Sequence, residues 1–220
     1  QTSPEFTGLS PATEYVFYQR VAETSTAAAS AASKGQKVKT HTNYNVLNTF
    51  NDIHKKDWYY KNGAIDYVYN GGLFGGTGGG KFEPNTNMTR GMFVTVLGRL
   101  SGIPENNKVN TRFADVKKGQ YYTGYVKWAS DAGIVSGTSA TTFEPNANVT
   151  REQICKMMVE YCAYADVKLK IVNKVITFAD QSSISSWART YVKKCQTAGL
   201  VNGSVKGGKT YFSPQGNATR

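Results

Sequence analysis

The stretch FEPNANVTREQ, residues 143–153, decides the fold of this chain, because close copies of it stand at two other places. An earlier copy reads FEPNTNMTR at residues 82–90, and a later copy reads FSPQGNATR at residues 212–220. The copies lie about sixty to seventy positions apart, which is longer than most solenoid repeats. The sequence therefore predicts three similar units, each a small subdomain.

Two further features accompany each copy. An aromatic-x-Asp opening, here called the FxD opening, precedes it at Phe50–Asp52, Phe113–Asp115 and Phe178–Asp180. A glycine turn lies between the opening and the copy, at residues 72–76, 133–137 and 199–203. The predicted order of parts in a unit is therefore FxD opening, first helix, glycine turn, proline turn and second helix, and the third unit lacks this second helix.

The second unit shows both predicted helices most clearly. Apolar side chains in its first helix recur at the spacing i, i+3, i+4 and i+7, at Tyr122, Tyr125, Val126 and Ala129. Gly133 follows as the expected C-terminal stop. In the second helix, Thr150 and Gln153 have the spacing of a capping box. The apolar stripe that follows comprises Ile154, Met157, Met158 and Tyr161.

The other two units repeat these stripes. The second helix of the first unit carries Phe93, Val96, Leu97 and Leu100, although Gly91 weakens its first turn. The first helix of the third unit carries Ala188, Tyr191, Val192 and Cys195. No stripe can be buried by one helix alone, so the units must pack on each other. We expect a mainly α fold, a pseudo-threefold helical assembly with the threonine-led helices at the centre.

The first 46 residues differ in character from the rest. Residues 14–22 and 37–40 are rich in β-formers and predict two short strands. The string LSPATEY, residues 9–15, resembles the entry to a tyrosine corner. The segment therefore resembles the last strands of a fibronectin type III domain; a β-hairpin linker is the alternative. The predicted boundaries are 1–46 for this segment, 47–108, 109–172 and 173–220 for the units, the third lacking its second helix.

Composition limits the classes of partner that this chain is expected to bind. The net charge of +11 and pI near 9.5 favour an anionic partner, although a basic solvated surface is the alternative. No run of five basic residues occurs, which argues against nucleic acid, and no apolar run is long enough for a membrane span. The three cysteines lack metal-ligand spacing and are expected to be buried thiols. We therefore expect no metal and no cofactor.

Arg90, Arg151 and Arg220 each follow the threonine expected to cap a helix. A cation at a helix start opposes the helix dipole and costs about 0.3–1 kcal/mol at an exposed site. A bound anion would resolve this conflict, because free backbone N–H groups and a guanidinium fork both favour carboxylate or phosphate. The alternative is that each arginine pairs with a structural carboxylate, such as the aspartate of an FxD opening.

The FxD opening, the glycine turn, the F-[ES]-P turn and the Thr-Arg helix start together resemble S-layer homology domains over roughly residues 48–220. The family motif ITRAE is matched here only in its threonine and arginine. The resemblance implies a noncatalytic module in which three repeats surround a central helical bundle. It also implies anchoring of an extracellular bacterial surface protein to a secondary wall polysaccharide, often one that carries ketal-linked pyruvate.

The resemblance also implies binding residues. The family's arginine corresponds to Arg90, Arg151 and formally Arg220. Aromatic faces for sugar rings would come from Trp58, Tyr121 and Trp187, whose alternative role is core packing. Close backbone approach to the sugar would come from Gly76, Gly137 and Gly203, whose alternative role is plain turn geometry.

Two other functions remain open. A glycan-active enzyme needs a pair of carboxylates in a cleft, and the recurring aspartates form no isolated pair of that kind. The chain could instead be the wall-anchoring tail of a secreted enzyme whose catalytic domain lies elsewhere. It could also belong to a surface-layer lattice or adhesion protein that associates with itself.

Overall fold

The computed structural model describes residues 14–17, 36–39 and 45–220. The chain divides into two compact units, residues 1–82 and residues 83–220, and each is described by itself. No helix in the described part of the chain has the length and apolar character that crossing a bilayer requires.

The first unit begins with a two-stranded antiparallel sheet. β1 (Glu14–Phe17) pairs with β2 (Gln36–Lys39). Both predicted strands therefore form, and each is four residues long. Most of the string that resembles a tyrosine corner, residues 9–13, lies outside the described residues. Three short helices follow: α1 (Val46–Thr49), α2 (Trp58–Lys61) and α3 (Ala64–Asn70). Around Phe50, Ile65 and Phe82 they bury a small core of apolar side chains.

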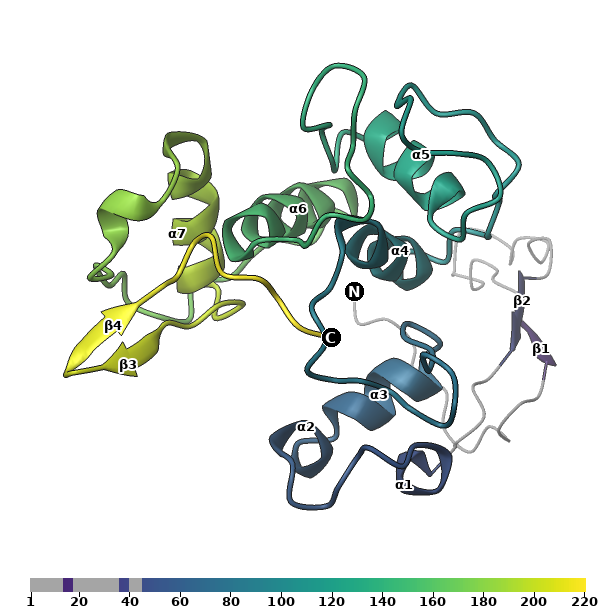
Figure 1. Ribbon diagram of the computed structural model, residues 1–220, viewed down its shortest axis with the longest axis horizontal. Helices are drawn as coiled ribbons and strands as arrows, with labels where there is room; N and C mark the ends of the chain where they lie inside the picture. The colour runs from purple at the N-terminus through teal and green to yellow at the C-terminus, as the bar shows by residue number, and fades with distance from the viewer. Residues whose placement is uncertain (1–13, 18–35, 40–44) are drawn as a thin grey trace, which may run out of the picture. The chain divides into compact units, whose positions relative to one another are not determined.

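The second unit holds four longer helices (Figure 1). They are α4 (Arg90–Leu100), α5 (Thr123–Asp131), α6 (Arg151–Tyr164) and α7 (Arg189–Thr197). Two 3₁₀ turns, η1 (Gln181–Ser183) and η2 (Ser186–Ala188), precede α7, and a hairpin of β3 (Ser204–Lys206) and β4 (Lys209–Tyr211) follows it. α5 packs against α4, and α7 packs against α6. The chain is thus mainly helical, as predicted.

Backbone hydrogen bonds join the three Thr-Arg segments into a closed ring within the second unit. Thr89 forms a bridge with Asn148, Thr150 forms one with Asn217, and Asn87 forms one with Thr219. Each Thr-Arg segment therefore contacts the other two through main-chain atoms. This ring provides the threefold relationship that the repeats predict.

Threonine caps start α4 and α6 as the sequence predicts. The hydroxyl of Thr89 accepts from Met92 N at 3.2 Å, and that of Thr150 accepts from Gln153 N at 3.3 Å. The side chain of Gln153 also accepts from Thr150 N at 3.1 Å, which completes the capping box.

The predicted apolar stripe of α4 was wrong in part. Leu97 is buried, but Phe93 and Val96 are half-buried and Leu100 is exposed. The buried face instead includes Gly91 and Gly98. A Cβ at Gly98 would collide with the Tyr125 ring, and a Cβ at Gly91 would lie 2.9 Å from Tyr122 Cδ1. Small residues on α4 thus let the tyrosines of α5 approach its backbone, a pairing that single-helix periodicity does not reveal.

Candidate functional site

The aspartate of each FxD opening holds the proline turn of its own repeat. The carboxylate of Asp115 accepts from Phe143 N at 2.9 Å and from Glu144 N at 2.7 Å. Asp180 accepts in the same way from Phe212 N and Ser213 N, and Asp52 accepts from Phe82 N at 2.9 Å. These carboxylates therefore clamp backbone amides.

The clamped turns contain strained backbone. The residue before the proline lies in the left-handed region in all three repeats, with φ of 56° at Glu83, 57° at Glu144 and 56° at Ser213. A non-glycine residue in this region costs of order 1–3 kcal/mol. In the second and third repeats the strained residue donates its own amide to the aspartate, so the clamp offsets the strain where it arises.

Arg90 extends from the start of α4 to the clamped turn of the second repeat. Its Nε donates to Phe143 O at 2.8 Å, and one Nη donates to Ser136 O at 3.2 Å. Its guanidinium carbon lies 4.5 Å from the centre of the Phe143 ring. Arg90 is only 4% exposed, and burial lowers its pKa, a shift that the charges of Glu144 and Asp115 oppose.

Arg151 repeats this geometry at the start of α6. Its Nε donates to Phe212 O at 2.8 Å, its Nη donates to Asn202 O at 2.7 Å, and its guanidinium carbon lies 5.0 Å from the centre of the Phe212 ring. Neither Arg90 nor Arg151 forms an ion pair with a carboxylate of the described residues. The fold therefore does not pair these two arginines with the aspartates of the FxD openings.

The backbone N–H groups at the two helix starts are occupied by the protein itself, which corrects the expected anion receptor. Arg90 N donates to Ala147 O at 2.9 Å, and Gly91 N donates to Pro145 O at 2.8 Å. At α6, Arg151 N and Glu152 N donate to carbonyl groups of the third repeat. The side chains around the guanidinium groups thus remain as the place for an anion.

A cavity of about 380 Å³ lies beside Arg90 in the second unit. It brings together three residues that the sequence singled out, one from each repeat: Arg90, Gly137 and Trp187. The other lining residues are Ile134, Val135, Ser136, Thr138, Gln153, Lys156 and Met157. Two cations line this cavity and no acidic side chain does, so its electrostatics favour an anionic ligand.

Several of these lining residues were missed from the sequence. Lys156 lies three residues after Gln153 on α6, and its Nζ lies 3.4 Å from Ser136 Oγ. The helical spacing of Gln153 and Lys156 puts both on the face of the capping box, and that spacing could have identified them. Ser136 and Thr138 had no sequence signal beyond their place in and beside the glycine turn.

The three singled-out aromatic residues are exposed, which contradicts their alternative role in the core. Trp58 is 71% exposed, Tyr121 is 40% exposed and Trp187 is 46% exposed. Trp187 lines the cavity at Arg90, whereas Trp58 belongs to the first unit. Burial raises the pKa of Tyr121, and the charges of Arg220 and Arg99 oppose that shift.

The three singled-out glycines pack against phenylalanines of the FxD openings. A Cβ at Gly76 would lie 2.8 Å from Phe50 Cε1, and one at Gly203 would lie 2.9 Å from Phe178 Cε1. A Cβ at Gly137 would lie 2.6 Å from Phe113 Cε1. Turn packing explains all three glycines, and Gly137 also lines the cavity.

Arg220 is placed differently from the other two arginines. Its backbone N donates to Thr86 O at 3.1 Å, which closes the ring of Thr-Arg segments. No described helix begins at this residue.

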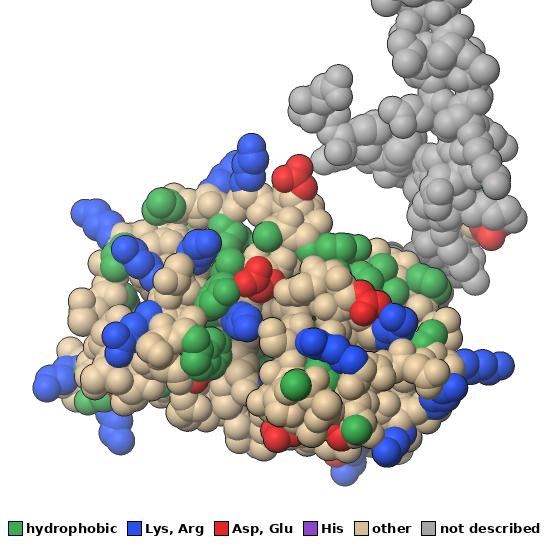
Figure 2. Space-filling model, turned by 90° about the horizontal axis from the view of Figure 1, so that it is seen from above, with side chains coloured by type: hydrophobic (Ala, Val, Ile, Leu, Met, Phe, Trp, Pro, Cys, Tyr) green, Lys and Arg blue, Asp and Glu red, His purple; other side chains and the backbone are tan. Residues whose placement is uncertain are grey.

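Basic side chains are spread over the face shown in Figure 2 and are not gathered into one patch. This agrees with the sequence, in which no run of five basic residues occurs. Arg90 and Lys156 differ from these spread side chains because both line one cavity.

Comparison with known proteins agrees with this architecture. The family model for the S-layer homology domain matches residues 49–91, 112–155 and 177–220. The chain is 33% identical over 171 residues to an endoglucanase of Bacillus sp. (strain KSM-635), covering 78% of the chain and 17% of the relative. It is 34% identical over 173 residues to an amylopullulanase of Thermoanaerobacterium thermosulfurigenes, and the match covers 78% of the chain and 9% of the relative.

A third relative is the surface-layer 125 kDa protein of Lysinibacillus sphaericus, 29% identical over 170 residues, covering 77% of the chain and 14% of the relative. The chain thus spans less than a fifth of the length of each of these relatives. The matched segments coincide with the three repeats, from FxD opening to Thr-Arg helix start. This chain therefore belongs to the S-layer homology domain family and contains three of its domains.

Proposed function

We propose that this chain anchors an extracellular protein to the bacterial cell wall by noncovalent binding of an anionic wall polysaccharide, with the cavity at Arg90 holding an acidic sugar. S-layer homology domains are noncatalytic modules that anchor surface-layer proteins, cell-wall enzymes and cellulosome-anchoring proteins to the wall. The single observation that carries the choice of ligand is a cavity lined by two cations, an exposed tryptophan and no carboxylate.

The lining chemistry suits a pyruvylated sugar. A pyruvate ketal presents a carboxylate and a methyl group on a sugar ring. The carboxylate would pair with Lys156 and with guanidinium N–H groups of Arg90, of which the protein uses two of about five. The methyl group and the ring face suit Met157 and Trp187. The hydroxyl groups of Ser136 and Thr138 and the amide of Gln153 would bind the sugar hydroxyls, because cavities of this size gain specificity from a few polar groups.

The repeated geometry at Arg151 supports a second site of the same kind. Its guanidinium binds Phe212 O and Asn202 O just as Arg90 binds Phe143 O and Ser136 O. We extend the proposal to Arg220 as the third arginine, with the domain limits 47–108, 109–172 and 173–220. Residues 1–46 would be the end of a fibronectin type III-like domain.

Two parent proteins fit this anchor. The printed names of the relatives include carbohydrate-degrading enzymes and a surface-layer protein. The chain would therefore be the tail of a wall-bound enzyme or part of a self-associating surface layer, located at the cell wall in either case.

Cosedimentation with native wall sacculi tests the proposal. We expect Lys156→Ala and Trp187→Ala each to weaken binding about tenfold, because each removes a side chain that lines the cavity. Neither residue belongs to the ring of Thr-Arg segments, so the fold should be kept. Arg151→Ala should weaken binding through the second site. Lys206→Ala, on the exposed β3–β4 hairpin, is the matched control. Sacculi whose ketals have been removed by mild acid should bind the unaltered chain weakly, and equal binding to both kinds of sacculi would refute the pyruvate assignment.

A further inference from the structure

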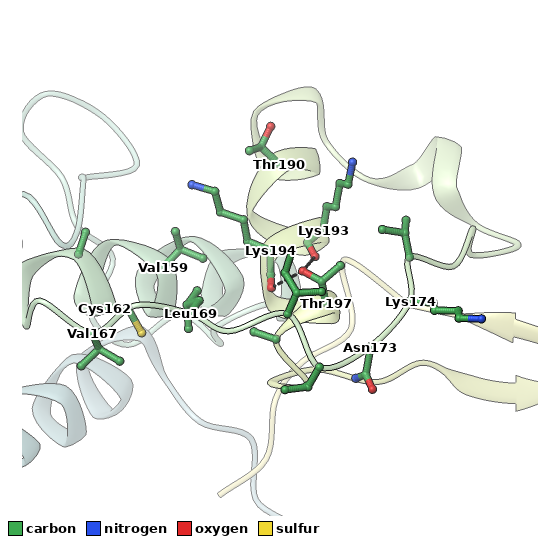
Figure 3. A pocket seen from close by; sticks show the side chains of 15 residues that line it. Val159, Cys162, Val167, Leu169, Asn173, Lys174, Thr190, Lys193, Lys194 and Thr197 are labelled. Carbon is green, nitrogen blue, oxygen red and sulfur yellow. Dashed lines mark hydrogen bonds between the residues drawn. The ribbon is translucent and has the colours of Figure 1, made fainter. Parts of the chain in front are cut away.

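A second and larger cavity, of about 1060 Å³, lies elsewhere in the second unit (Figure 3). Its walls are α6, α7 and residues 165–176, the linker that follows α6. It shares no lining residue with the cavity at Arg90. We call this cavity the linker groove.

The linker leaves an unusual amount of apolar surface uncovered. Five of the fourteen large hydrophobic side chains exposed in the described part of the chain lie within ten residues: Val167, Ile171, Val172, Val175 and Ile176. Ile171 is 82% exposed. The corresponding linker between α4 and α5 carries Ile103 and Val109, and both are half-buried. Clustered apolar exposure of this kind marks an interaction site more often than a scattered surface does.

The two helices present their side chains to the groove at helical spacing. α6 contributes Val159, Cys162 and Ala163 from one face. Figure 3 shows Thr190, Lys193, Lys194 and Thr197 along α7, with Leu169 and Asn173 contributed by the linker. A groove between two helix faces suits a peptide segment with an apolar side.

Hydrogen bonds tie the linker to α7, so the groove is a formed feature. Val172 N donates to Thr197 O at 2.9 Å, and Gln196 Nε2 donates to Lys174 O at 2.8 Å. Asn173 Nδ2 also donates to Gln196 O at 3.3 Å. The exposed apolar residues of the linker are therefore held beside the groove.

The charge of the groove selects the partner. Lys174, Lys193 and Lys194 are among its lining residues, and none of its lining residues is acidic. Lys168 and Lys170 alternate with the apolar residues of the same linker. A second copy of this chain, with its net charge of +11, is electrostatically unfavourable in such a groove. A hydrated sugar would leave the apolar walls without a partner.

We infer that the linker groove is a docking site for a segment of another protein that has apolar residues on one side and aspartate or glutamate beside them. The apolar residues pack between α6 and α7, and the carboxylates pair with the lysines at the rim. Such a site gives the wall anchor a second contact that is separate from the polysaccharide.

Fluorescence anisotropy with two labelled peptides tests this inference. One peptide of about fourteen residues carries leucine at i, i+3, i+4 and i+7 with glutamate elsewhere, and the matched peptide carries lysine in place of glutamate. We expect the acidic peptide to bind the chain and the basic peptide not to bind. The double variant Lys193→Glu/Lys194→Glu should weaken binding of the acidic peptide at least about tenfold, because it reverses the rim charge. Val175→Asp should weaken it through the apolar wall.

The matched control is Lys206→Glu/Lys209→Glu on the β3–β4 hairpin, which changes net charge equally and should leave peptide binding unaltered. If the control variant lost as much affinity for the acidic peptide as the groove variant, net charge alone would explain the effect, and the inference would be overturned. Equal binding of both peptides, or binding of phosphatidylglycerol vesicles without binding of the acidic peptide, would overturn it as well. Circular dichroism confirms that each variant is folded, and unchanged cosedimentation of the groove variants with sacculi separates this site from the polysaccharide site.

Discussion

The guanidinium of Arg90 and the backbone of Phe143 form a single joint between two repeats: Nε donates to Phe143 O at 2.8 Å while the cation covers the Phe143 ring at 4.5 Å. The amide of the same residue donates to Asp115 at 2.9 Å. Phe143 thus accepts from the preceding repeat and donates to its own FxD opening. The arginine therefore holds the fold together, and it also lines the cavity of the proposed ligand site.

Replacing Arg90 with alanine should therefore lower stability as well as binding. The change leaves the carbonyl groups of Phe143 and Ser136 without their donor, and we expect a loss of about 2–4 kcal/mol in the free energy of unfolding. Arg90→Lys should restore little of it, because lysine lacks the planar fork. Urea denaturation followed by circular dichroism measures the free energy of unfolding of both variants. An unchanged value in Arg90→Ala would contradict the role of Arg90 in joining the two repeats.

Asp115→Ala tests the clamp on the proline turn. The carboxylate accepts two backbone amides, one of them from the strained residue Glu144, so its loss should cost about 2–3 kcal/mol. Asp131→Ala is the control. It removes an exposed ion pair with Lys127 and should cost no more than about 0.5 kcal/mol. Similar losses in the two variants, by urea denaturation, would argue against the clamp.

Gly98→Ala should destabilise the chain although alanine is the better helix former. The added Cβ would collide with the Tyr125 ring, and overpacking of this kind costs about 1–3 kcal/mol. The melting temperature reports the loss. Adding Tyr125→Leu to Gly98→Ala should recover part of it, because the smaller side chain makes room; no recovery would mean that the close approach is not the cause.

The three thiols should resist modification in the folded protein. Cys155, Cys162 and Cys195 are buried, and burial is what protects them: the contact between Cys155 and Cys195 raises the pKa of Cys155 but lowers that of Cys195. Ellman's reagent should therefore react slowly at pH 8 with the native chain and rapidly with all three cysteines in denaturant. Fast reaction of the native chain would show that α6 and α7 separate.

Burial raises the pKa of the Cys162 thiol, and this shift gives a pH dependence. A thiol whose pKa is raised on folding stabilises the native state below its unfolded pKa of about 8.5, and that contribution declines as the pH rises above this value. The free energy of unfolding should therefore fall less between pH 7 and pH 10 in Cys162→Ala than in the unaltered chain. Urea denaturation at the two pH values measures this fall, and an equal fall in both proteins would contradict the prediction.

The sequence predicted the repeat architecture well because each unit carries local signals. The Thr150–Gln153 capping box and the stripe from Tyr122 to Ala129 depend on neighbours three or four positions apart, which periodicity records. The face of α4 depends on tyrosines that arrive from α5, and nothing within residues 90–100 encodes that contact. Gly91, interpreted as a weak helix start, is in fact the space that Tyr122 needs.

The candidate site was predicted in part for a similar reason. Arg90, Gly137 and Trp187 stood out because they recur in every unit, although only the fold shows that one cavity draws them from three different repeats. Lys156 does not recur in this way, since the equivalent position of α4 is Thr95. The expected use of helix-start amides failed because the acceptors, such as Ala147 O, come from a different repeat.

The ring of Thr-Arg segments determines how such an anchor can change in length. Deleting residues 212–220 would remove the acceptors of Arg151 N and Glu152 N, which leaves the start of α6 open, and would also remove the acceptor of Met88 N in the segment before α4. The three repeats are therefore not independent of one another, because each shares main-chain hydrogen bonds with its neighbours. Loss of one repeat therefore removes backbone partners from another, and a shortened anchor needs new acceptors for those groups.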